Sequence, residues 1–178
     1  MRINFVLALV LSAAVVVAGP LSARVVARKT LFHSGAWLVK IIGYDDGTIY
    51  CEAKVSYPSN TFAIWARPGR NAQLQFYDSG WKFSKSRADV RVRIDRRPRW
   101  NLTNARLSGH SVFFTLPDGN ASRRFLREVM YGNTVRLYNR SGSLIHNYSL
   151  AGSNASILAL TKCVKLLKTR GQDKNPFN

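Results

Sequence analysis

Acidic residues are scarce in this sequence. Its 178 residues contain 9 Asp and Glu against 27 Lys and Arg, which gives a formal net charge of +18 at pH 7. The only glutamates are Glu52 and Glu128. Such an excess of positive charge favours anionic partners, namely nucleic acid, lipopolysaccharide, acidic lipids or acidic glycans. High solubility or a basic proteome would explain the same charge without any binding function.

Sequence motifs for metal binding and catalysis are missing. The sequence has no CxxC pair, no GxSxG motif and no HxH or HxxxH spacing, so we expect no metal, no cofactor and no enzyme activity. Its histidines lie far apart in the chain, although distant histidines could still converge in space: His33, His110 and His146. Nothing in the sequence selects a glycosidase-like pair among its candidate carboxylates. These are Asp45, Asp46, Asp78 and Asp95.

The N-terminal apolar run, residues 3–18, is shorter than the ~20 residues that a membrane-spanning helix needs. It follows Arg2 and precedes small residues and a basic segment, which is the layout of a secretory signal peptide. We predict a signal peptide over residues 1–23 that is cleaved after Ala23. Cleavage after Ala18 is the alternative position, and an uncleaved N-terminal anchor is the alternative interpretation of the segment. The predicted protein is therefore periplasmic or secreted and has no transmembrane span after cleavage.

Cysteine is rare as well, with only Cys51 and Cys163 in the chain. An even count in an exported protein predicts a disulfide, and free buried thiols are the alternative. Alternation over residues 48–57 places Cys51 on the apolar face of a strand. A helical wheel over residues 153–168 places Cys163 on the apolar stripe, with Ser153 as the N-cap. The two predicted buried faces favour a bond between this strand and the last helix.

Short apolar runs separated by turn residues predict a mainly β protein. The expected strands are 36–42, 48–57, 61–66, 72–77, 81–94, 100–107, 111–116, 134–138 and 144–150. Helical periodicity indicates a short helix over 121–130 and a C-terminal helix over 153–168. We predict one domain, residues 36–168, folded as an antiparallel β-sandwich or half-open barrel with the C-terminal helix packed on it. Residues 24–35 are expected to be a flexible lead-in, and 169–178 a flexible tail.

A basic stretch, residues 82–106, carries the clearest functional signal. Arginine side chains suit phosphate and carboxylate groups, and the interleaved aromatic rings suit stacking. The candidate residues for an anionic ligand are Lys82, Lys85, Arg87, Arg91, Arg93, Arg96, Arg97, Arg99 and Trp100. The alternative is a solvated strand face whose charge discourages aggregation. No pattern of a nucleic-acid-binding fold accompanies the stretch, and the predicted export argues against a specific nucleic-acid partner.

The start of the predicted domain and its last quarter resemble small exported alphaproteobacterial proteins. The resemblance is carried by Trp37, Cys51, the segment 148–153 (YSLAGS), and the helix residues Ala155, Ala159 and Cys163. The nearest named group is the invasion-associated locus B family of periplasmic proteins. This resemblance implies a non-enzymatic, β-rich envelope protein with a host-interaction role. The alternative function is a protein-interaction module, such as an inhibitor or immunity protein, that uses a loop or a sheet edge.

Overall fold

The computed structural model describes residues 23–172, which form one antiparallel ten-stranded sheet and two helices. The sheet order is β1-β2-β3-β4-β5-β8-β7-β6-β9-β10. The strands are β1 (Val25–Ser34), β2 (Trp37–Tyr44), β3 (Ile49–Ser56), β4 (Asn60–Arg67), β5 (Arg70–Asp78), β6 (Phe83–Ile94), β7 (Trp100–Gly109), β8 (Ser111–Thr115), β9 (Thr134–Tyr138) and β10 (Leu144–Ser149). The helices are α1 (Asn120–Tyr131) and α2 (Ser153–Gln172). Apart from Ala23, the predicted signal peptide lies outside the described residues.

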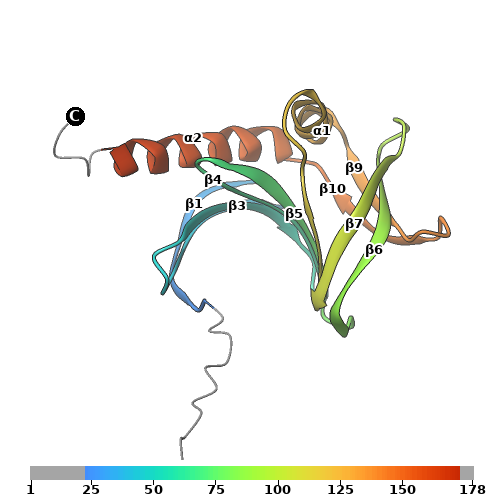
Figure 1. The fold of residues 1–178 in the computed structure, drawn as a ribbon. Helices are drawn as coiled ribbons and strands as arrows, with labels where there is room; N and C mark the ends of the chain where they lie inside the picture. Colours follow the sequence, from blue (N-terminus) through green and yellow to red (C-terminus); the bar gives the residue numbers. More distant parts are fainter. Residues whose placement is uncertain (1–22, 173–178) are drawn as a thin grey trace, which may run out of the picture.

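The predicted mainly β fold with a C-terminal helix on the sheet is confirmed. Strands β2–β5 bow into an arch, and α2 lies along its convex side, where it contacts β1, β2, β3 and β4 (Figure 1). Helix α1 contacts α2 at the side of the molecule where β6, β7 and β9 lie (Figure 1). Both helices thus lie on the same face of the sheet, and no helix of residues 23–172 lies on the concave face of the arch. Among residues 23–172, no helix is both long enough and apolar enough to cross a membrane.

Alternating side chains explain which face of the sheet the helices cover. On β3, Cys51, Ala53 and Val55 are fully buried, and their register partners on β2 and β4 are mostly apolar. On α2, Ile157 and Leu160 are nearly inaccessible to solvent. A period of two on the strands and a period near 3.6 on the helix bring these apolar sides together. The core therefore lies between the sheet and the helices.

The predicted disulfide is confirmed. Cys51 on β3 is bonded to Cys163 on α2, with 6.1 Å between their Cα atoms and a sequence separation of 112. Both residues are buried, as the strand alternation and the helical wheel predicted. Disulfides of this kind form and persist in oxidising compartments. The bond fastens the C-terminal helix to the convex side of the arch.

The predicted flexible lead-in is wrong, because residues 25–34 form β1 at one edge of the sheet. Its backbone pairs with β2 in antiparallel register, although most of its side chains are exposed. An edge strand with two exposed faces needs no apolar alternation, so the sequence carried no periodic signal. At the other end of the chain α2 extends to Gln172, four residues beyond the predicted end, so the first four residues of the predicted tail are helical.

Two glycines meet where the β10–α2 junction packs on the β1–β2 turn. Gly152 has a φ of +96°, and a Cβ added there would overlap the Ser34 carbonyl group. Gly35 has a φ of +56°, and a Cβ there would lie 2.7 Å from the Ala151 carbonyl oxygen. Both positions need positive φ and a missing side chain at once.

Ser153, the predicted N-cap of the last helix, does not use its hydroxyl to cap that helix. The hydroxyl donates to the Val129 carbonyl oxygen of α1 at 2.7 Å.

Candidate functional site

The basic stretch forms β6, the following turn and β7. Along β6 the side chains of Val90, Val92 and Ile94 are buried in the core. Arg91 and Arg93 alternate with them and project from the opposite face, which no helix covers. The sequence alternation therefore describes this strand correctly, and it places the arginines on the uncovered face of the sheet.

Neighbouring strands add cationic and aromatic side chains to this face. In the antiparallel register, Arg87 pairs with Arg106 on β7, and Arg93 pairs with Arg136 on β9. Residues opposite each other in a ladder share a face of the sheet, so these side chains are neighbours. We call the resulting group the arginine surface: Arg87, Arg91, Arg93, Arg96, Arg97, Arg99, Arg106, Arg136 and Tyr138.

Arg91 and Arg99 bring two guanidinium groups together on the arginine surface. Each has a terminal nitrogen 3.9 Å from the position where a Cβ of Gly142 would lie, so the two groups converge near the β9–β10 turn. Arg99 also lies over the ring of Tyr138, with 5.0 Å from Cζ to the ring centre. Within the described part of the chain, neither arginine has a carboxylate within 4.0 Å. These two cations are therefore free to meet an external anion.

Other arginines of the surface are engaged in holding the turn after β6. Arg93 donates through Nε to the Arg97 carbonyl oxygen and through Nη2 to the Arg96 carbonyl oxygen, both at 3.1 Å. Arg136 donates to the Asp95 carbonyl oxygen at 3.1 Å. Asp95 itself has a φ of +52°, pairs with Arg97 at 3.0 Å, and accepts hydrogen bonds from two backbone amides at the start of β9. These residues keep their charge but also stabilise the turn.

Two lysines predicted with the arginines lie elsewhere along the hairpin. Lys82 precedes β6 and Lys85 is near its beginning, and both side chains are exposed. At about 3.3 Å per residue, they lie roughly 30 Å from Arg93 along the strand. Asp89, an acid on the same face between Arg87 and Arg91, is engaged through its Oδ1 by the Asn104 amide at 2.9 Å. The lysines therefore extend the basic face but do not join the convergent pair.

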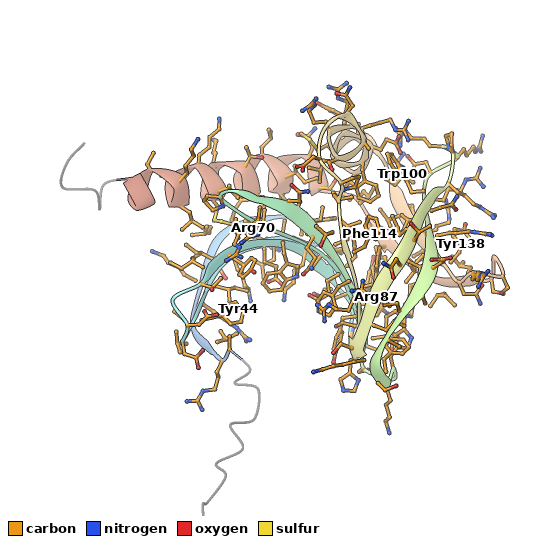
Figure 2. All side chains as sticks on the ribbon, in the orientation of Figure 1. Tyr44, Arg70, Arg87, Trp100, Phe114 and Tyr138 are labelled. Atoms are coloured by element: carbon orange, nitrogen blue, oxygen red, sulfur yellow. A yellow bond between two sulfur atoms is a disulfide. The ribbon has the colours of Figure 1, made fainter. Side chains whose placement is uncertain are left out.

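Trp100 lies on the opposite, core-facing side of the sheet from Arg91. Its Nε1 donates to Glu128 Oε2 on α1 at 2.8 Å, and its ring packs edge-on against Phe125. Figure 2 shows its side chain beside α1, whereas Tyr138 lies on the β6–β9 side of the molecule. Arg124 covers the ring, with 4.2 Å from Cζ to the ring centre. The structure thus gives Trp100 a role in attaching α1 to the sheet and does not bring it to the arginine surface.

Replacing Trp100 by Phe is expected to lower the free energy of unfolding by about 1–2 kcal/mol and to leave anion binding unchanged. The loss follows because the half-buried carboxylate of Glu128 would lose a hydrogen-bond donor. Urea denaturation measures the stability, and co-sedimentation with anionic vesicles measures the binding. Weaker vesicle binding at unchanged stability would show that Trp100 belongs to the binding surface.

The four candidate carboxylates each hold a turn or a strand end. Asp46 accepts a hydrogen bond from the Thr48 amide at 2.8 Å, and this bond holds the pKa of the Asp46 carboxyl below its usual value. Asp45 accepts one from the Arg24 amide at 2.8 Å. Asp78 Oδ2 lies 2.7 Å from His146 Nε2, next to the buried Tyr148, whose phenol pKa is raised by burial. Among residues 23–172, no group of three acidic, histidine or cysteine side chains converges as a metal site.

Two members of the arginine surface, Arg136 and Tyr138, were missed in the sequence. Alternation over residues 134–138 places both on the polar face of a strand. That signal was present, but only the pairing of β9 with β6 puts them beside the basic stretch.

Comparisons with protein-family models, with curated proteins and with solved structures found no match. The resemblance to the invasion-associated locus B family therefore stays a prediction.

Proposed function

We propose that this protein is an exported, non-enzymatic binding protein whose arginine surface holds an anionic component of the cell envelope or of a host surface. The convergence of Arg91 and Arg99 beside Tyr138, with no carboxylate within 4.0 Å among the described residues, carries the proposal. The disulfide supports an oxidising compartment, and the N-terminal sequence pattern supports export to the periplasm or secretion.

Guanidinium groups bind phosphate and carboxylate oxygens through paired N–H donors. Arg93 and Arg136 hold the turn after β6 through backbone carbonyl oxygens, and this turn leads directly to Arg99. The guanidinium group of Arg99 packs on the ring face of Tyr138, and this contact supports the Arg99 side chain. The arrangement therefore suits a surface that carries repeated phosphate or carboxylate groups, such as an acidic lipid layer or lipopolysaccharide.

The double substitution Arg91→Ser with Arg99→Ser is expected to weaken binding to phosphatidylglycerol-containing vesicles roughly thirtyfold at low salt. Each cation near an anionic surface contributes about 1 kcal/mol, so two together contribute about 2 kcal/mol. Co-sedimentation at several salt concentrations measures the effect, and lipopolysaccharide provides the second anionic probe.

A matched control is the double variant Arg123→Ser with Arg127→Ser, which removes the same charge from the exposed side of α1. This control is expected to bind nearly as well as the unchanged protein. Equal losses of vesicle binding in both double variants would show that net charge alone explains the effect. Unchanged binding of the Arg91/Arg99 variant would rule out the arginine surface as the binding site.

Within residues 23–172 β1 is an edge strand of the sheet, and this edge supports a second candidate function, a protein-interaction module. β1 ends the sheet and exposes Val26, Leu31 and Phe32 at 62%, 43% and 37% of their surface. An unpaired strand edge with apolar side chains can accept a strand from a partner. Capture of a partner that stays bound at high salt and is released by Leu31→Lys would favour this function over the charge-driven one.

A further inference from the structure

The concave face of the arch is hollowed into a continuous groove. Four hollows lie along it, and they adjoin because Trp65 and Gln73 each line three of them. One hollow, of 480 Å³, reaches from Trp65 to Arg28 and Lys40 on β1 and β2. The last, of 310 Å³, ends at Arg106 on β7. We call this feature the concave groove; it lies on the side of β2–β5 away from α2, where the side chain of Tyr44 is also found (Figure 2).

The walls of the concave groove are held in place by a chain of hydrogen bonds. Trp65 Nε1 donates to Gln75 Oε1 at 2.7 Å, and Gln75 Nε2 donates to Ser111 Oγ at 2.9 Å. Tyr50 packs edge-on against Trp65, with 6.0 Å between ring centres. Arg67 lies over Tyr50, with 5.0 Å from Cζ to the ring centre. A ligand would therefore meet preformed aromatic and amide groups rather than having to order them.

Glu52 is the unusual residue of this groove. Its side chain projects to the concave face, yet the residue is only 4% exposed. Within the described part of the chain, neither of its carboxylate oxygens accepts a hydrogen bond, and Oε2 is fully enclosed. Lys54 Nζ lies 3.4 Å from Oε2, an ion-pair distance without hydrogen-bond geometry. Among residues 23–172 Lys54 is the only ion-pair partner of this carboxylate, so Glu52 keeps hydrogen-bond acceptor capacity for a ligand.

Cations outnumber the single acid in the hollow that Glu52 lines. Arg28, Lys40 and Lys54 surround the same space, and among residues 23–172 only Lys54 has a carboxylate within 4.0 Å. A complementary ligand must therefore carry hydrogen-bond donors for Glu52 and a negative charge for Arg28 and Lys40. It must also present an apolar face to the ring of Trp65.

We propose that the concave groove binds a saccharide that carries carboxylate groups. Sugar hydroxyls donate to Glu52 Oε1, the carboxylate oxygen that is not fully enclosed, and to the amide oxygens of Gln73 and Gln75. The C–H face of a sugar ring packs on Trp65. The sugar carboxylate meets Arg28 and Lys40. A nucleic acid fits less well, because its phosphates offer only acceptors beside Glu52. A neutral saccharide would leave the two cations without partners.

The groove shares Arg87 and Arg106 with the arginine surface at one end, but the residues that carry the two proposals are different, so this proposal does not rest on the proposed function. Glu52, Trp65 and Gln75 belong to β3, β4 and β5, whereas Arg91 and Arg99 belong to the β6–β7 hairpin. Substitutions at Glu52, Trp65 or Gln73 leave Arg91 and Arg99 intact, so the two proposals can fail independently. The elongated shape of the groove also favours a chain of several sugars over a single ring.

The test is calorimetric titration of the protein with an oligogalacturonate of defined length. Titrations with a neutral malto-oligosaccharide, with polyphosphate and with single-stranded DNA serve as comparisons. Oligogalacturonate is expected to bind most tightly. Trp65→Leu and Glu52→Gln are each expected to weaken it tenfold or more, because each removes a contact made only in this groove. Arg91→Ser with Arg99→Ser is expected to leave this binding unchanged.

Glu128→Gln is the matched control for Glu52→Gln, because it neutralises a glutamate that lies on α1, away from the groove. Gln73→Ala provides a groove variant that leaves the core untouched, since Gln73 makes one side-chain bond, to Thr115 at 3.5 Å. This variant is expected to bind several-fold more weakly and to fold normally. The proposal is overturned if no binding occurs, if polyphosphate, DNA or the neutral sugar binds as well, or if the groove variants bind like the unchanged protein.

Discussion

Removing the Cys51–Cys163 bond is expected to lower the free energy of unfolding by about 4–5 kcal/mol. The bond closes a long loop, with 112 residues of separation, and so restricts the unfolded chain strongly in the chain-entropy description. A loss of this size is a large share of the 5–15 kcal/mol that ordinarily separates folded from unfolded domains. Urea denaturation of the double variant Cys51→Ala with Cys163→Ala measures it.

Chemical reduction provides the control for this prediction. Dithiothreitol should lower the denaturation midpoint of the unchanged protein to near that of the double variant and should leave the double variant unaffected. An unchanged midpoint after complete reduction, verified by mass spectrometry, would contradict the stabilising role of the bond. Release of α2 from the arch is expected first, because the bond is the covalent link between them.

Gly152→Ala is expected to lower the free energy of unfolding by about 2–5 kcal/mol. The backbone there has a φ of +96°, which costs an L-residue roughly 1–2 kcal/mol, and the new methyl group would overlap the Ser34 carbonyl group. Relieving the overlap requires the β1–β2 turn to move away from the start of α2, and such overpacking costs about 1–3 kcal/mol more. Thermal and urea denaturation followed by circular dichroism measure the loss.

Gly47→Ala separates the two contributions. Gly47 also has a positive φ, +77°, but a Cβ there would meet nothing within 4 Å. The Gly47 variant should therefore show only the conformational cost, about 1–2 kcal/mol. If both variants lose the same stability, the close contact between Gly152 and Ser34 contributes nothing, and the junction tolerates a side chain.

Periodicity in the sequence predicted most elements because burial on one side of a strand or helix is a local property. The alternation around Val90 and Val92 and the stripe through Ile157 and Leu160 are both visible within about ten residues. The same reasoning failed for β1, whose exposed side chains carry no alternation. Alternation also does not reveal that the bowed strands enclose Glu52, on the face opposite Cys51, to 4% exposure.

Some residues of the candidate site could be predicted from the sequence, and others only from the structure. The sequence identified Arg91 and Arg99 as cationic side chains in a basic stretch, because charge is a property of the residue alone. It placed Trp100 with them by proximity in sequence, and the structure separates them because neighbours on a strand project to opposite faces. Arg136 and Tyr138 joined the arginine surface only through the pairing of β9 with β6.

The sequence by itself determined the class of fold, the positions of nearly all elements, the pairing of Cys51 with Cys163 and the location of the positive charge. These features depend on residue type and on spacings of two to four residues. The tertiary structure decided the order of strands beyond the consecutive hairpins, the contact of Gly35 with the β10–α2 junction, and the concave groove around Glu52. Those features arise from packing between segments far apart in the chain, where the curvature of the whole sheet determines which polar side chains become enclosed.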